Sequence, residues 1–93
     1  MKVRTVFLDR DGVLNADNPN YIRSLDDICI QDGVPDAIRA LSEEGKRIIV
    51  ISNQAGIGKG LLNVQDAEAI FDKIIDGAES AGGNIMARYY CPH

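Results

Sequence analysis

The sequence has no excess of positive charge and no long apolar segment. Ten Lys and Arg stand against fourteen Asp and Glu, which gives the 93 residues a net charge of -4. A general nucleic-acid binder normally presents a basic surface, so this balance argues against one. The longest apolar run is the four residues from Ile48 to Ile51, whereas a membrane-spanning helix needs about 20. We therefore expect neither nucleic acid nor a membrane among the partners.

Cysteine is also scarce, and the first residues lack the apolar region and cleavage site of a secretion signal. Two cysteines, Cys29 and Cys91, are too few for a disulfide scaffold, so we expect a cytoplasmic protein in a reducing environment. Cys29 lies between Ile28 and Ile30, and its side chain is expected to be a small buried apolar group.

Three segments have the composition of strands. Val3 to Leu8 and Asn84 to Tyr90 are rich in β-branched and aromatic residues. Ile48 to Ile51 shows no polar alternation, which is typical of a strand covered on both faces in a parallel sheet. A shorter extended piece is expected at Ile28 to Ile30.

Two segments have the apolar period of helices. The first is predicted to begin near Val34, with Pro35 in its first turn and Asp32 or Gly33 as its cap, and to end at Gly45. The second is predicted to begin at Asn63 and to end at Gly82-Gly83, and its apolar stripe comprises Val64, Ala67, Ile70, Phe71, Ile74, Ile75 and Ala78. Strands that alternate with helices predict a βαβαβ unit, although two helices cover both faces of a three-stranded sheet poorly.

Two polar loops follow the first and second predicted strands. Asp9 and Asp11 lie two residues apart in the first loop, and Ser52, Asn53 and Gln54 form the second. Ligands of an open parallel sheet bind at the carboxyl ends of its strands. Paired carboxylates suit Mg²⁺, and they also suit a nucleophile with a proton carrier beside it. From spacing alone, a polar turn in which Asp caps backbone amides is an equal interpretation.

The longer strings around these loops carry a resemblance. Val-Phe-Leu-Asp-Arg-Asp-Gly-Val-Leu-Asn, followed about forty residues later by Ile-Val-Ile-Ser-Asn-Gln, resembles the haloacid dehalogenase superfamily. Within it the chain is similar to the group of histidinol-phosphate and D-glycero-D-manno-heptose 1,7-bisphosphate phosphatases. The match continues through 32–34, 53–60 and 89–93, and so covers essentially the whole chain. It implies a Rossmann-like parallel α/β sheet of the haloacid dehalogenase type, of which residues 1–93 hold only the first three strands and two helices. The C-terminal part of a single phosphatase domain is then absent.

The resemblance implies roles for the residues of both loops. Asp9 would be the nucleophile that becomes an aspartyl phosphate, and Asp11 would protonate the leaving oxygen and later activate water. Mg²⁺ would be held by the Asp9 carboxylate and the Asp11 backbone carbonyl. Ser52 would hydrogen-bond the phosphoryl group, while Asn53 and Gln54 would line the substrate.

Further matched positions are expected to border the substrate. Ala55 and Lys59 lie in the glycine-rich segment, where Lys59 stands at a position at which relatives usually carry Arg. Asp17, Asn20 and Tyr21 fall in a segment that touches substrate in the heptose phosphatases, with solvated turn residues as an equal alternative.

Cys91 and His93 could supply two zinc ligands, whereas a structural zinc site needs four. In the resembled group this Cys-Pro-His opens a loop that closes with a Cys-x-Cys, which this chain lacks. Zinc is therefore expected to be incomplete or absent here.

Together these features predict a Mg²⁺-dependent phosphatase of carbohydrate metabolism that acts on a small phosphorylated substrate, most simply a heptose bisphosphate. The alternatives are a histidinol-phosphate phosphatase and a truncated, non-catalytic remnant or interaction module of the same fold. The superfamily's later lysine and its acidic residues after a fourth strand are missing. We therefore expect the isolated 93-residue fragment to be inactive and to self-associate through the unpaired edge of its first strand.

Overall fold

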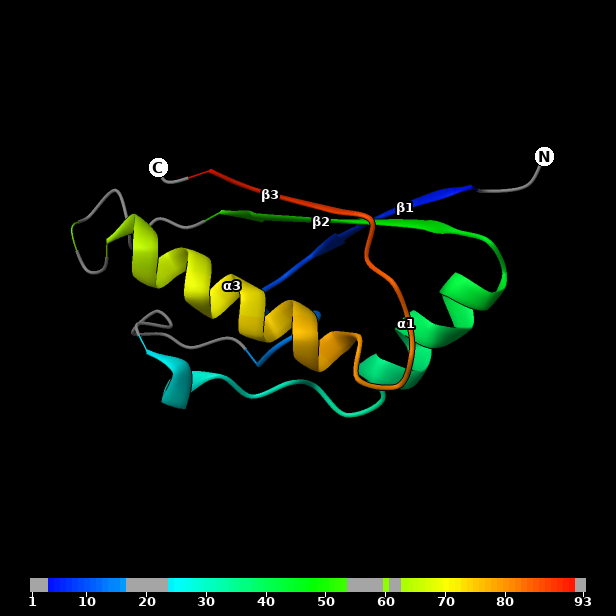
Figure 1. Ribbon diagram of the computed structural model, residues 1–93, viewed down its shortest axis with the longest axis horizontal. Coiled ribbons are helices and arrows are strands. Elements are labelled where there is room, and N and C mark those ends of the chain that lie inside the picture. The colour runs from blue at the N-terminus through cyan, green and yellow to red at the C-terminus, as the bar shows by residue number, and fades with distance from the viewer. Residues whose placement is uncertain (1–3, 17–23, 54–59, 61–62, 92–93) are drawn as a thin grey trace.

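The computed structural model, drawn in Figure 1, describes residues 4–16, 24–53, 60 and 63–91. Its elements in chain order are β1 (Thr5–Asp9), the 3-10 helix η1 (Leu25–Asp27), α1 (Val34–Glu43), β2 (Arg47–Asn53), α3 (Val64–Ala78) and β3 (Ala87–Cys91). The three strands form one sheet in the order β1-β2-β3, and both strand pairs are parallel. The predicted parallel βαβαβ arrangement is confirmed.

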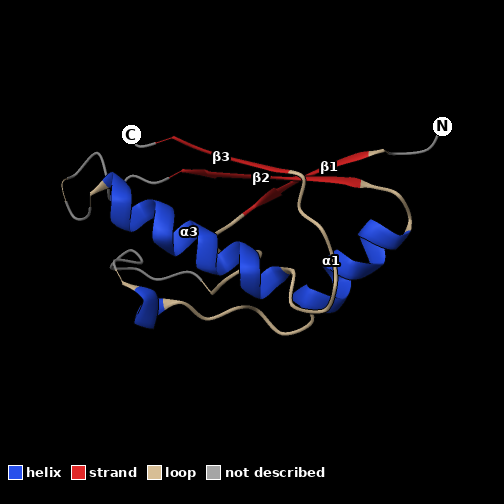
Figure 2. Cartoon of the chain, viewed as in Figure 1, coloured by secondary structure: helices blue, strands red, loops and turns tan. Residues whose placement is uncertain are grey.

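Both helices lie on the same face of this sheet (Figure 2). Two crossovers of one hand that step the same way across a sheet place their helices on one side. Burial along β2 alternates accordingly, because Ile48, Val50 and Ser52 are buried whereas Ile51 and Asn53 are exposed. Among the described residues one face is covered, in agreement with the expectation that two helices cover both faces poorly; the apolar run from Ile48 to Ile51 alone does not indicate this.

We call the sheet face away from the helices the open face, and it is formed by Phe7, Asp9, Ile49, Ile51 and Tyr89. Phe7 pairs with Ile49 across the sheet, and Ile51 pairs with both Asp9 and Tyr89. Phe7, Ile51 and Tyr89 are 63%, 45% and 61% exposed, respectively. The open face is therefore an apolar surface that ends in a carboxylate.

The helices begin where their capping residues predict. Gly33 precedes α1 with a φ of +82°, a left-handed conformation that glycine adopts without strain. The Asn63 side chain accepts a 2.8 Å hydrogen bond from the Asp66 N–H at the start of α3. In the part of the chain that the structure describes, no helix combines the length and the apolar character that crossing a membrane requires.

The end of α3 differs from the prediction. The helix ends at Ala78 rather than at Gly82-Gly83, and β3 begins at Ala87 rather than at Asn84. A loop fills the interval, in which the Ile85 N–H donates a 2.6 Å hydrogen bond to the Glu79 carboxylate. Gly83 passes close to α1, since a Cβ there would lie 2.8 Å from the Arg39 backbone nitrogen.

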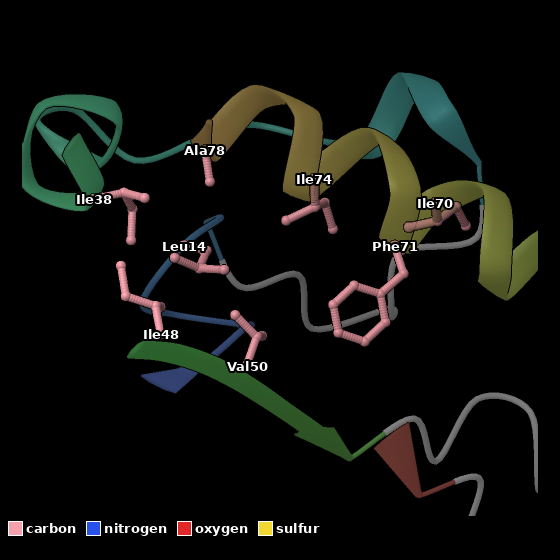
Figure 3. Close-up of a cluster of buried hydrophobic side chains, with 8 residues drawn as sticks. All are labelled: Leu14, Ile38, Ile48, Val50, Ile70, Phe71, Ile74 and Ala78. Carbon is pink, nitrogen blue, oxygen red and sulfur yellow. The ribbon is translucent and has the colours of Figure 1, made fainter. Parts of the chain in front are cut away.

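The core fills the space between the helices and the covered face of the sheet (Figure 3), and its members are Leu14, Ile38, Ile48, Val50, Ile70, Phe71, Ile74 and Ala78. Two sequence predictions about burial are wrong. Val64 is 52% exposed because it is the first residue of α3, one turn before the first buried position. Cys29 is exposed because Ile28 and Ile30, its neighbours in an extended segment, turn toward the core instead.

Candidate active site

The polar residues at the ends of β1 and β2 surround one depression of about 230 Å³. Its lining comprises Asp9, Arg10, Asp11, Ile51, Ser52 and Asn53. The two strands are parallel and Asp9 pairs with Ile51, so both carboxyl ends reach the same edge of the sheet. Pockets that enclose a whole small molecule usually measure roughly 300–1,000 Å³. The described part of the site therefore suits one end of a ligand.

Asp9 is the last residue of β1, and its side chain lies on the open face. It is exposed, while Leu8 before it packs partly against the core and Arg10 after it is buried. This alternation follows from the period of two in a strand. The Asp9 carboxylate is thus accessible to a ligand, as a nucleophile must be.

Asp11 is held in a different way, by a network of side-chain hydrogen bonds. Arg10 Nη2 donates to Asp11 Oδ1 at 2.9 Å and to Oδ2 at 3.2 Å, and Arg10 Nε donates to Oδ1 at 3.2 Å. Asn15 Nδ2 donates to the same Oδ1 at 3.0 Å. The side chain of Arg10 is 2% exposed and that of Asp11 is 28% exposed, so this carboxylate lies at the boundary between the core and the depression.

A tight turn brings these groups together. The Arg10 carbonyl accepts N–H groups of Val13, Leu14 and Asn15 at 3.2, 2.8 and 3.2 Å, and the Gly12 N–H donates to the Asn15 carbonyl at 2.8 Å. Arg10 and Asn15 were not among the residues expected at the site. An Arg between two acids, with an Asn four residues after the second, is the sequence signal that could have indicated them.

Ser52 and Asn53 occupy the last two positions of β2. Ser52 is 5% exposed and lies on the covered face, while Asn53 is exposed. Asp9, Asp11, Ser52 and Asn53 are therefore the four expected site residues that the structure brings together.

The other expected residues lie outside the described part of the chain, namely Asp17, Asn20, Tyr21, Gln54, Ala55, Lys59 and His93. Cys91 ends β3. Among the described residues, no three His, Cys, Asp or Glu side chains gather as a metal-binding cluster. Nothing in these ranges supports a zinc site.

Magnesium suits the depression better, because its polar lining offers oxygen donors. Mg²⁺ is usually bound by one or two carboxylates together with waters and substrate phosphate. The Asp9 carboxylate is exposed, whereas the Asp11 carboxylate is already bonded to Arg10 and Asn15. The exposed Asp9 carboxylate therefore suits one position of a partial magnesium shell that waters and substrate phosphate complete.

A larger depression of about 610 Å³ lies elsewhere, where η1 meets α3, and its lining comprises Leu25, Ala69, Asp72, Lys73, Asp76 and Gly77. It lies at neither strand end. Size alone therefore does not identify the site in this molecule.

Polar contacts also join α3 to β3. Arg88 pairs with Glu68 and Asp72, and the Tyr90 hydroxyl donates to Glu68 Oε1 at 2.9 Å. This hydrogen bond, together with desolvation, raises the pKa of Tyr90 above its usual value of 10.0.

Comparisons with known proteins agree with this geometry. No family model matches the sequence. A D-glycero-beta-D-manno-heptose-1,7-bisphosphate 7-phosphatase of Neisseria meningitidis is 34% identical over 91 residues, which is 98% of this chain and 49% of that protein. The crystal structure of D,D-heptose 1,7-bisphosphate phosphatase from B. bronchiseptica, complexed with magnesium and phosphate, matches with a TM-score of 0.91 and 32% identity. This match covers 98% of the present chain and 51% of the B. bronchiseptica chain.

A had-like phosphatase from Mesorhizobium loti also matches, with a TM-score of 0.79 and 25% identity over 89% of this chain and 39% of that one. In sequence and in fold the chain therefore matches part of a haloacid dehalogenase-like phosphatase. The similar proteins include heptose bisphosphate phosphatases, and the chain spans about half the length of the curated relatives it matches.

Proposed function

We propose that this chain carries the nucleophile and the acid-base group of a Mg²⁺-dependent phosphatase, and that residues 1–93 are the N-terminal part of its domain. The observation that carries the proposal is the meeting of Asp9, Asp11, Ser52 and Asn53 around one depression at two parallel strand ends. The relatives support it, because they are named as phosphatases and one solved structure is complexed with magnesium and phosphate.

The reaction proceeds in two steps at Asp9. An Asp9 carboxylate oxygen forms a bond to phosphorus while the bond from phosphorus to the leaving oxygen breaks, and Asp11 gives that oxygen its proton. Water then attacks the phosphorus of the aspartyl phosphate and Asp11 takes the water's proton, which regenerates the Asp9 carboxylate and releases inorganic phosphate. Ser52 donates a hydrogen bond to the phosphoryl group, and Asn53 lines the substrate.

The Asp9 carboxylate and the Asp11 backbone carbonyl would hold Mg²⁺. When bound, the ion offsets negative charge on the transferring phosphoryl group. The residues of this chain supply the nucleophile, the proton and the hydrogen bonds around it.

The substrate that fits best is a heptose bisphosphate-type sugar phosphate, since the matched relatives are named for that substrate. Gln54, Ala55 and Lys59, with Asp17, Asn20 and Tyr21, are proposed to contact it beyond the depression. A lysine at position 59 would contact a second phosphate as a point charge and not as a planar fork. A cytoplasmic location stays a prediction from the low cysteine content.

A second candidate function is a non-catalytic interaction module of the same fold. The observation that favours it is the coverage of only about half of each relative. The two candidates differ in whether Asp9 turns over a phosphate ester once the fold is complete.

The test uses a fusion protein in which this chain is followed by the part of the B. bronchiseptica phosphatase that the match leaves uncovered. We expect Mg²⁺-dependent phosphate release, and a fall of more than ~10³-fold on Asp9→Asn because the attacking oxygen is replaced by an amide. Asp26→Asn, an exposed acid in η1, is the matched control and should change little. An Asp9→Asn variant that keeps activity within tenfold would refute the nucleophile assignment.

The 93-residue chain by itself is expected to show no appreciable turnover and to self-associate. Among the described residues no strand pairs with the outer edge of β1, and the open face is apolar. Both features favour pairing with a second copy. Light scattering of the chain and of its Phe7→Thr variant tests this, with a smaller particle expected for the variant. A monomeric chain with Mg²⁺-dependent turnover would contradict both expectations.

A further inference from the structure

Arg10 is a buried cation next to a carboxylate of the proposed mechanism. It is 2% exposed and is one of the largest fully buried side chains among the described residues. Burying a guanidinium costs several kcal/mol unless it is paired, and a buried ion pair is often no more stable than apolar residues of the same volume. An arrangement of this kind is therefore better explained by the orientation it imposes than by stability.

The pairing of Arg10 with Asp11 restricts the direction of the carboxylate. Three donors reach Asp11 Oδ1, namely Arg10 Nε, Arg10 Nη2 and Asn15 Nδ2, and Arg10 Nη2 also reaches Oδ2. A planar guanidinium that contacts both oxygens defines the plane of a carboxylate as well as its distance. Asp11 lies in a turn outside the regular elements, so these contacts help to fix its rotamer.

Arg10 is itself fixed from the core side. Its guanidinium carbon lies 5.3 Å from the centroid of the Phe71 ring on α3, and Arg88 of β3 lies 5.1 Å from the same centroid. Asn15 is fully buried and its Nδ2 also donates to the Ala16 carbonyl at 3.1 Å. Both side chains that hold Asp11 are therefore anchored before any ligand binds.

We propose that Arg10, assisted by Asn15, is the positioning residue for Asp11 and holds its carboxyl group in line for proton transfer to the leaving oxygen. The inference rests on the proposed function, because Arg10 can orient Asp11 for proton transfer only if Asp11 is the acid-base group. Arg10 borders the depression but is only 2% exposed, so we expect it to act through Asp11. Loss of Arg10 should therefore affect the proton transfer far more than the attack by Asp9.

The dependence on the leaving group separates these two steps. p-Nitrophenyl phosphate releases a phenolate that needs little protonation, whereas glycerol phosphate releases an alkoxide that needs a proton in the transition state. In the fusion protein we expect Arg10→Lys to lower kcat for glycerol phosphate by about 100-fold, the scale of a misplaced catalytic group. With p-nitrophenyl phosphate the loss should be within about threefold, and KM should change little for either substrate.

The ratio of the two rates is measured on one sample, so it does not depend on the folded fraction. Arg39→Lys is the matched control, because Arg39 makes a similar 2.9 Å contact to Glu43 on the surface of α1. Asn15→Ser removes one donor to Asp11. If circular dichroism shows that Arg10→Lys is unfolded, Asn15→Ser is measured in its place. Either variant should change the ratio in the same direction as Asp11→Asn.

Equal losses on both substrates, or none, in the variant measured would overturn the positioning role. Failure of the proposed function gives a different result, because the unsubstituted fusion protein would then hydrolyse neither substrate or Asp11→Asn would leave the ratio unchanged. In that case the NMR signal of the Arg10 Nε–H tests the Arg10–Asp11 contact itself, which we call the clamp. It should be resolved and slow to exchange in the unsubstituted protein and lost in Asp11→Asn, and a signal averaged with those of exposed arginines would refute the clamp.

Discussion

The two faces of the sheet carry similar residues in very different surroundings. On β2, Ile48 and Val50 are fully buried, whereas Ile51 is 45% exposed. The strand sequence does not distinguish them, because the run from Ile48 to Ile51 is apolar throughout. The difference comes from the two crossover helices, which both pack on the same face.

The same division passes through the candidate site. Asp9 ends the row of residues on the open face, while Arg10 and Asn15 are buried on the side of the helices. The proposed nucleophile is thus accessible, and the groups that hold its partner Asp11 are anchored in the core. A catalytic pair needs one accessible group and one group of fixed orientation. Asp9 and Asp11, two residues apart at the end of β1, meet these two requirements together.

The comparison of the faces is tested most strongly by truncating one residue on each. Ile48→Ala should lower the free energy of unfolding by about 2–5 kcal/mol, because it opens a cavity in the core. Ile51→Ala should cost less than about 1 kcal/mol, since its side chain is already partly in water. Chemical unfolding measures both losses at a concentration at which light scattering shows a monomer, and equal losses there would contradict the exposure of the open face.

Gly83→Ala should have a smaller effect that arises from packing between elements. A Cβ there would lie 2.7 Å from Ile38 Cγ2 and 2.8 Å from the Arg39 backbone nitrogen, which cannot move independently of α1. We expect a loss of about 1–3 kcal/mol by overpacking. Gly77→Ala is the control, because its Cβ would meet only the Ile30 side chain, and a larger loss there than at Gly83 would contradict this packing account.

The smallest expected effect concerns Tyr90 at high pH. Its hydrogen bond to Glu68, and then burial, raise the pKa of Tyr90 in the folded state above the usual 10.0. The folded state therefore binds this proton more tightly than the unfolded state, and the resulting stability is present below pH 10 and lost as the pH rises through the higher folded value. Unfolding of the chain and of Tyr90→Phe across this range should show a difference that shrinks above pH 10, and a constant difference would contradict the assignment.

Much of the fold follows from local signals in the sequence. Gly33, Pro35 and Gly45 bracket α1, and Asn63 caps α3. The exposure of Val64 and Cys29 does not follow from them, because an apolar stripe gives no information on how far the sheet extends beneath a helix or which neighbour in an extended segment turns inward. The exposure of the open face likewise depends on where both crossover helices pack. The sequence of β2 alone does not contain that information.

The site shows the same limit. Asp9, Asp11, Ser52 and Asn53 could be predicted together, because parallel strands end at one edge of a sheet. The part played by Arg10 could not, since the direction of its side chain depends on a turn closed by its own carbonyl and on a ring from α3. The spacing of residues in the sequence predicts which side chains reach the carboxyl edge of the sheet. Tertiary packing determines which of these side chains is fixed in one orientation.

The central claim is that Asp9 receives a phosphoryl group, and the most direct measurement is to locate that group. The fusion protein bearing Asp11→Asn is incubated with Mg²⁺ and p-nitrophenyl phosphate, quenched in acid, and digested for mass spectrometry. We predict one phosphoryl group on the peptide that contains Asp9, and none when Asp9→Asn is added. Phosphate on another residue, or turnover by the unsubstituted protein with no phosphopeptide in either form, would contradict the account.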